Sequence, residues 1–102
     1  MIRHCVFIRY KPETPAELKR QIGNEIAALK GRLVGLEAVY VGDNVSPEGL
    51  DKGHGEGFIV DFTDDAARDR YLEDAEHKKT GAKIVAAAEG GIEGIFVYDL
   101  RL

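Results

Sequence analysis

The chain has 102 residues, of which 44% are hydrophobic and 31% are charged, the balance of one globular domain rather than of a disordered segment. Its formal net charge of -4 argues against a nucleic-acid or anionic-membrane surface, because both need an excess of positive charge. No apolar run approaches the roughly 18 residues of a membrane span, and the polar start does not resemble a signal peptide. The lone Cys5 cannot form an intrachain disulfide, so we expect a reducing, cytoplasmic location.

Residues 2–10 are rich in β-branched and aromatic types and predict a strand. Because side chains alternate between the two faces of a strand, both faces are partly apolar. One face carries His4, Val6, Ile8 and Tyr10, and the other carries Cys5 and Phe7.

The next segment predicts an amphipathic helix. Thr14 is the expected N-cap, Pro15 takes the first helical position and Glu17 closes a capping box. Apolar residues then recur every three or four positions up to Leu33, which predicts one buried stripe and an end near Gly35.

Residues 36–41 predict a second strand, and the turn-rich residues 42–53 predict a long surface connection. Residues 57–62 predict a third strand. If that strand is entered from His54, alternation places His54, Glu56 and Phe58 on one face.

Residues 63–65, Thr-Asp-Asp, predict the capped start of a second helix. The helical pattern becomes ambiguous after Asp74, resumes over residues 82–88 and ends at Gly90 and Gly91. Residues 95–100 predict the last strand.

The order β-α-β-β-α-β predicts an α+β, ferredoxin-like sandwich formed by a single domain, residues 1–102. The helices would cover one face of a four-stranded sheet. The other face would still carry Cys5, Phe7 and Ile59, and exposed apolar area costs roughly 25 cal/mol per Å². We therefore expect a homodimer that covers this face.

Tyr71 and His77 form the best-placed pair for proton transfer. Six residues of continuous helix would hold them apart around the axis, so they converge only if the helix breaks near Asp74 and Ala75. His77 could then act as a general base while the Tyr71 hydroxyl polarises a carbonyl group. The alternative is a tyrosine at the edge of the core and a solvent-exposed histidine.

Three further polar residues are candidates for binding a substrate. His4 either forms a hydrogen bond at the boundary between sheet and helices or lines a pocket beneath the helices. His54 and Glu56 could orient each other or a ligand, although the glycines around them are also typical of a bulge. One cysteine and scattered histidines predict no metal site, and Phe58 replaces the third glycine of a dinucleotide fingerprint, so we expect no cofactor.

Taken together, these motifs resemble the stress-responsive A/B barrel (Dabb) family, whose domains form dimeric α+β barrels. The resemblance covers nearly the whole chain and rests on the following residues in this order: His4, Gly42-x-Asn44-x-Ser46-x-Glu48-Gly49, Phe62-Thr63-Asp64, Ala67, Tyr71 and His77. It implies that the open sheet face pairs with a second sheet. Many members have no established activity, but a plant branch contains a polyketide cyclase.

In that cyclase, a tyrosine and a histidine at the spacing of Tyr71 and His77 serve the reaction, and a histidine at the position of His4 lines the pocket. The chain departs from the family at Asp74-Ala75, where His-Pro is common, and at Glu56, where a histidine is common. Both changes alter the charge and shape of the implied pocket.

Two hypotheses follow. In the first, the protein is a stress-response-like dimer that binds a small apolar or carbonyl-containing ligand between sheet and helices. In the second, it is a cofactor-independent cyclase- or isomerase-like enzyme, with His77 and Tyr71 as catalytic residues and His4, His54 and Glu56 as substrate-binding residues. A purely structural self-associating domain would leave His54 and Glu56 unexplained.

Overall fold

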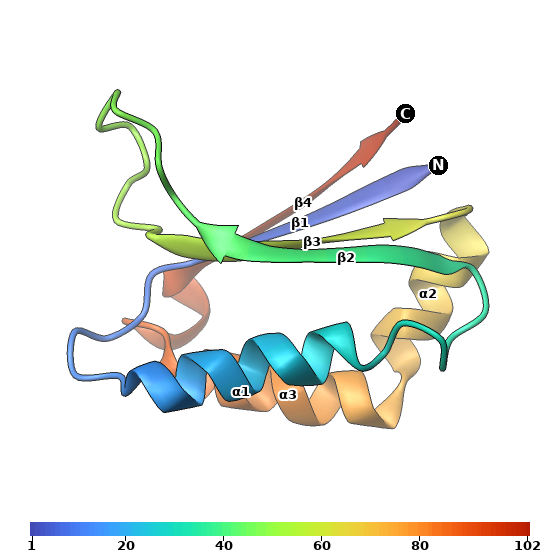
Figure 1. Ribbon diagram of the computed structural model, residues 1–102, viewed down its shortest axis with the longest axis horizontal. Coiled ribbons are helices and arrows are strands. Elements are labelled where there is room, and N and C mark those ends of the chain that lie inside the picture. The colour runs from blue at the N-terminus through green and yellow to red at the C-terminus, as the bar shows by residue number, and fades with distance from the viewer.

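The computed structural model describes residues 1–102 and has two layers, a four-stranded sheet and a layer of helices on one of its faces (Figure 1). The elements in chain order are β1 (Ile2–Ile8), α1 (Ala16–Ala27), β2 (Leu36–Asp43), β3 (Glu56–Phe62), α2 (Asp65–Glu73), α3 (Ala75–Ala87), the short 3₁₀ helix η1 (Gly91–Gly94) and β4 (Ile95–Arg101). None of the helices has the length and apolar character needed to cross a membrane.

The sheet has the strand order β2-β3-β1-β4, and every neighbouring pair is antiparallel. This arrangement confirms the expected ferredoxin-like α+β fold. The central strand β1 pairs with both β3 and β4, so that His4 lies opposite Val60 on one side and opposite Asp99 on the other. The register therefore brings a residue near the C-terminus beside the histidine near the N-terminus.

The start of α1 differs from the expectation. Pro15 takes the N-cap position without a side-chain hydrogen bond, so the predicted capping box is wrong. The Thr14 hydroxyl instead donates to the Ala87 carbonyl at 3.4 Å and ties this connection to the end of α3. The regular helix also ends at Ala27, short of the expected Leu33, and continues as turns that reach the left-handed Gly31.

The helix does break between Tyr71 and His77, which is the condition under which the two residues can converge. Asp74 has extended backbone angles (φ -65°, ψ 133°), so α2 ends before it and α3 begins after it. Its carboxylate accepts a hydrogen bond from the His77 backbone N–H at 3.0 Å and pairs with Arg32 at 3.2 Å. Asp74 is thus both the end of one helix and the cap of the next.

The hydrophobic core fills the space between the sheet and the helices. Its completely buried members include Ile26 of α1, Val60 and Phe62 of β3, and Tyr71 of α2. These residues lie on the face of the sheet that alternation assigned to His4, Val6 and Ile8. The pattern of the first strand therefore identified the buried face correctly.

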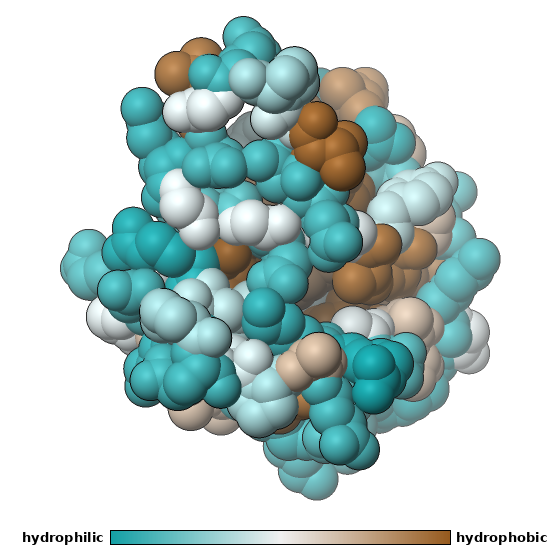
Figure 2. Space-filling model, turned by 60° about the vertical axis from the view of Figure 1, so that its left-hand side comes forward, coloured by the Kyte–Doolittle hydropathy of each residue, from teal (hydrophilic) through white to brown (hydrophobic).

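The opposite, open face of the sheet keeps large apolar side chains exposed. Tyr40, Phe96, Tyr98 and Leu100 expose 56%, 54%, 41% and 43% of their surface. Figure 2 shows hydrophobic side chains reaching the surface below the projecting β2–β3 connection. At the other end of this face, Arg3 donates two hydrogen bonds of 2.9 Å to the carboxylate of Asp61.

Candidate functional site

The helix break brings Tyr71 and His77 together. Tyr71 lies near the end of α2 and His77 in the first turn of α3, and their ring centroids are 4.0 Å apart. Tyr71 is completely buried, whereas His77 is partly buried. Phe62 packs on the Tyr71 ring at 5.1 Å. The pair therefore lies at the edge of the core rather than in open solvent.

Both residues of the pair contain a buried polar atom without a hydrogen-bond partner. These atoms are the hydroxyl oxygen of Tyr71 and Nδ1 of His77. An unsatisfied buried polar group costs about 1–3 kcal/mol, and folded proteins contain few of them. Two such atoms on adjacent rings make this pair a candidate functional site.

Burial also sets the protonation of this pair. It raises the pKa of the Tyr71 phenol far above its ordinary value, so the hydroxyl keeps its proton. Burial lowers the pKa of His77, and the positive charge of His4 would lower it further. At neutral pH the pair thus consists of a hydroxyl donor beside an uncharged imidazole.

His4 joins the pair from the sheet. It is almost completely buried on β1, and its ring centroid lies 5.6 Å from that of Tyr71 in an edge-on arrangement. Its Nδ1 lies 2.7 Å from Oδ1 of Asp99. His4 is therefore hydrogen-bonded at the boundary between sheet and helices and also belongs to the Tyr71–His77 cluster.

Asp99 is a residue that the sequence reading missed. Arg68 of α2 donates to its second carboxylate oxygen, Oδ2, at 2.6 Å. Burial works to raise the pKa of the Asp99 carboxyl, but the hydrogen bonds from His4 and Arg68 hold it below its ordinary value. The available signal was a single acidic residue inside the otherwise apolar run of residues 95–100.

Glu56 and His54 lie outside this cluster. Glu56 pairs with Ile8 at the far end of β1, and its carboxylate accepts a hydrogen bond from the Lys19 ammonium group at 3.0 Å. His54 precedes β3, with Nδ1 2.9 Å from the Asp51 carbonyl oxygen and its ring against Phe96.

The expected common face for His54 and Glu56 is therefore wrong. The strand begins at Glu56, so alternation does not extend back to His54. The chain turns at Gly53, which has a left-handed φ of 84°, and this turn directs His54 toward the open face of the sheet. Glu56 faces α1 instead.

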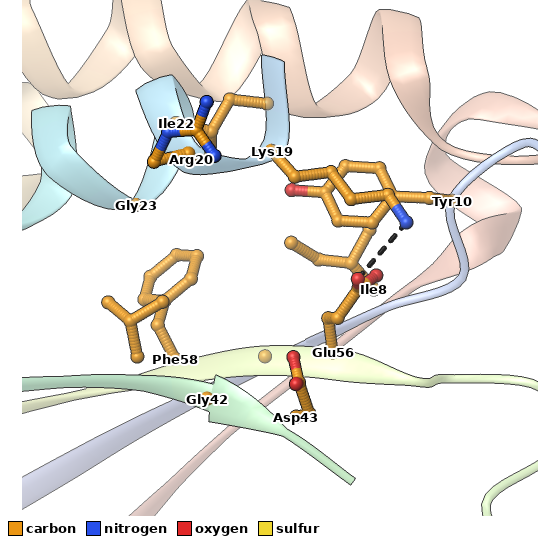
Figure 3. Close-up of a pocket in the computed structure, with 12 residues that line it drawn as sticks. Ile8, Tyr10, Lys19, Arg20, Ile22, Gly23, Gly42, Asp43, Glu56 and Phe58 are labelled. Atoms are coloured by element: carbon orange, nitrogen blue, oxygen red, sulfur yellow. Dashed lines mark hydrogen bonds and ion pairs between the residues drawn. The ribbon is translucent and has the colours of Figure 1, made fainter. Parts of the chain in front are cut away.

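A cavity of about 340 Å³ lies between α1 and the sheet, away from the cluster (Figure 3). Phe58 rises from β3 toward α1, and the Lys19–Glu56 ion pair stands beside the ring of Tyr10. The residues that line the cavity are Ile8, Tyr10, Lys19, Arg20, Ile22, Gly23, Val41, Gly42, Asp43, Glu56, Gly57 and Phe58. Its walls are thus mainly apolar and its rim is charged.

Gly23 helps to keep this cavity open. It lies inside α1, where glycine is less favourable than alanine by about 1 kcal/mol, so its position calls for a packing reason. A Cβ atom at Gly23 would lie 3.1 Å from Cγ1 of Val41 on β2. The missing side chain therefore leaves space between the helix and the sheet.

The cluster and the cavity occupy different ends of the same inner sheet face. His4 and Ile8 are four residues apart on β1, which corresponds to roughly 13 Å. Neither Tyr71 nor His77 lines the cavity. No group of three or more His, Cys, Asp or Glu side chains is arranged to hold a metal ion.

Comparison with known families agrees with this architecture. Residues 2–101 match the family model described as the stress responsive A/B barrel domain (Dabb). The chain therefore belongs to this family. No curated protein matches the chain.

Solved structures share the fold over the full length of the chain. A dimeric ferredoxin-like protein of unknown function from Jannaschia sp. CCS1 is 29% identical, with a TM-score of 0.93 over 99% of this chain and 98% of that one. The Arabidopsis thaliana protein At3g17210 is 19% identical, with a TM-score of 0.87 over 100% and 95% of the two chains. The hydroxynitrile lyase from Passiflora edulis is also 19% identical, with a TM-score of 0.85 over 99% and 92%.

Proposed function

We propose that this protein is a homodimer that binds a small apolar or carbonyl-containing compound between the helices and the sheet. The observation that supports this function most directly is the cavity under α1, which combines apolar walls with a charged rim. Pockets of this volume and character are typical of small-molecule sites. Glu56 and Lys19 at the rim would meet the polar part of the ligand, and Ile8 and Phe58 the apolar part.

The open sheet face supports the dimer. Its exposed aromatic side chains would bury apolar area against a second copy, and similar structures from Jannaschia sp. CCS1 and Thermobifida fusca are described as dimeric. In this arrangement the partly buried Phe7 and Ile59 would line the interface and His54 would lie at its rim, whereas Cys5, which was expected there too, is already buried within the protomer.

The dimer is tested with Phe96→Asp, which places a charge on the exposed aromatic patch. We expect sedimentation to show a monomer that keeps the helical content of the wild type. Val34→Asp is the matched control, because Val34 is even more exposed but lies outside the open face. A Phe96→Asp variant that stays dimeric would rule out this interface.

Ligand binding is tested with 2-heptanone, a neutral ketone that combines an alkyl chain with a carbonyl group. We expect it to shift the backbone amide NMR signals of residues around Gly23 and Val41. Gly23→Val should abolish these shifts because the new side chain occupies the cavity. Gly81→Val is the control, since Gly81 also lies inside a helix but faces open space. Equal shifts in both variants would exclude this cavity as the site.

A second candidate function is cofactor-independent proton transfer on a carbonyl compound, and the unpartnered atoms of Tyr71 and His77 favour it. The neutral His77 imidazole would take a proton next to the carbonyl group while the Tyr71 hydroxyl donates to the carbonyl oxygen. His4 would help to orient the substrate. The fold is compatible with catalysis, since the Passiflora edulis protein that shares it is a hydroxynitrile lyase.

Hydrogen–deuterium exchange at the carbon next to the ketone of 2-heptanone separates the two functions. Catalysis predicts exchange in D₂O that falls about a hundredfold or more in His77→Gln, the usual effect of removing a general base. Ligand-dependent NMR shifts without any exchange would identify a binding protein instead. Tyr71→Phe should lower exchange in the same way, because the polarising hydroxyl is lost.

A further inference from the structure

A chain of short polar contacts connects α2, β4 and β1 behind the Tyr71–His77 pair. Arg68 donates to Oδ2 of Asp99 at 2.6 Å, and Oδ1 of Asp99 lies 2.7 Å from Nδ1 of His4. His4 is almost completely buried, whereas the side chains of Asp99 and Arg68 are each about one-fifth to one-quarter exposed. The chain therefore runs from the protein surface to the buried cluster.

The Asp99 carboxylate determines which nitrogen of His4 carries the proton. An ionised carboxylate only accepts hydrogen bonds, so the ring nitrogen that faces it must be an N–H group. In the neutral ring, Nδ1 then holds the hydrogen and Nε2 has a free lone pair. Because the positions of Asp99 and Arg68 are set by β4 and α2, the ring orientation of His4 is fixed as well.

We propose that Nε2 of His4 is a proton acceptor of this site, and that Asp99 and Arg68 are the positioning residues that keep it available. The proposal rests on the second candidate function and revises one role in it: His4, rather than His77, takes the proton next to the carbonyl group. His4 was expected only to help bind a substrate, but its pairing with a carboxylate is the arrangement that orients histidine bases in hydrolytic enzymes. His77 has no such partner on its buried Nδ1.

The corresponding step conserves atoms and charge. The C–H bond next to a ketone breaks, and its electron pair is delocalised onto the carbonyl oxygen, which accepts a hydrogen bond from Tyr71. The proton goes to Nε2 of His4, and the Asp99 carboxylate stabilises the resulting imidazolium. Asp99 from β4, Tyr71 from α2 and His77 from α3 lie next to His4 in this step, and Arg68 from α2 acts on it through Asp99.

Asp99→Asn provides a specific test because Arg68 constrains the asparagine. The guanidinium group needs an acceptor, so the amide oxygen should face Arg68 and the amide NH₂ group should face His4. That NH₂ group requires a lone pair on Nδ1, which moves the hydrogen of the neutral ring to Nε2. The substitution is therefore expected to reverse the tautomer of His4 with little change in the shape of the site.

The measurement is the ¹⁵N NMR spectrum of the imidazole rings of the intact protein, recorded through a pH titration without ligand. In the wild type we expect Nδ1 of neutral His4 to carry the hydrogen and Nε2 to gain the proton on acidification. In Asp99→Asn the two nitrogens should exchange roles. The control is Asp61→Asn, which also breaks a carboxylate–arginine pair but on the open face, and it should leave His4 as in the wild type.

A wild-type His4 that carries its hydrogen on Nε2 would overturn the proposal, and so would an unchanged tautomer in Asp99→Asn. The wild-type spectrum decides the question even if the variant fails to fold. The ketone exchange assay then tests the second candidate function separately: where the wild type exchanges, Asp99→Asn should lose about a hundredfold in rate at unchanged ketone affinity. A wild-type rate in Asp99→Asn would also overturn the proposal.

Discussion

The two ends of the space between sheet and helices differ in what they offer a ligand. At the end with Tyr71 and His77, aromatic rings pack closely and two polar atoms have no partner. At the end with Gly23 there is a cavity, and the Lys19–Glu56 pair satisfies its own charges. Reactive groups and free space are thus separated along β1. Under the proposed function a ligand would enter the cavity without rearrangement, whereas engaging Tyr71 would require the packing around it to open.

The largest expected effect is a difference in packing energy between the end with Tyr71 and the end with the cavity. Phe62→Ala removes a completely buried ring beside Tyr71 and should lower the free energy of unfolding by about 3–5 kcal/mol. Phe58→Ala should cost less, because its ring already borders the cavity. Urea unfolding of both variants at one protein concentration measures the difference. Equal losses would show that the two ends are packed alike.

The second-largest expected effect on stability comes from the Tyr71 hydroxyl, which has no hydrogen-bond partner. Tyr71→Phe removes a buried, unsatisfied polar atom and should raise the free energy of unfolding by about 1 kcal/mol or more. Tyr10→Phe, beside the cavity, should change it little because the Tyr10 hydroxyl is not among the buried unsatisfied atoms. The comparison is made by thermal and urea unfolding. A stability loss in Tyr71→Phe would mean that the hydroxyl has a hydrogen-bond partner.

The pH dependence of stability provides a smaller effect. The pKa of His77 is lowered in the folded protein, so the unfolded chain binds more protons just below its ordinary value of about 6.5. The stability contributed by neutral His77 is full above that pH and decreases as the pH falls through the lowered pKa. His77→Gln should make the melting temperature less dependent on pH in this window. An unchanged pH profile in that variant would contradict the burial of the ring.

A second pH window belongs to the contact between α1 and α3. Hydrogen bonds from Lys83, Thr80 and Gln21 lower the pKa of Glu25 to about 2. The stability that Glu25 contributes is therefore present above about pH 4.5 and decreases toward pH 2, which separates it from the His77 window. Glu25→Gln should remove the loss of stability toward pH 2 and leave the His77 window unchanged. Unfolding followed by circular dichroism measures both.

The smallest effect tests the space next to Gly23. Gly81→Ala should stabilise the protein by up to about 1 kcal/mol, because its Cβ meets no neighbour and alanine favours helix. Gly23→Ala should gain less, since its Cβ would crowd Val41 at 3.1 Å. Differential scanning calorimetry of the two variants gives the difference. An equal gain would mean that Val41 moves freely and that Gly23 is not needed for packing.

Much of the fold could be predicted because its signals are local. Alternation along residues 2–10 identified the buried face of β1, and the Thr63-Asp64-Asp65 motif predicted the capped start of α2. The error at Thr14 has a physical cause: its hydroxyl has an alternative partner, the carbonyl of Ala87, that is distant in sequence. A capping motif does not reveal such competition.

The candidate site could be predicted only in part. The spacing of Tyr71 and His77 identified the pair and the condition under which it converges, but the break at Asp74 that brings the two rings together is seen only in the structure. Asp99 escaped notice because a single acidic residue in a strand has many structural explanations. His54 and Glu56 were assigned to one face because alternation was extended past the true start of β3.

The sequence by itself determined the order of the elements and the two-faced character of the sheet. These properties depend on periodicity and capping, which act over a few residues. Only the tertiary structure decided that β4 pairs with β1, and this pairing brings Asp99 to His4 from 95 positions away. It also decided where space remains, because a cavity depends on how α1 and the sheet pack against each other.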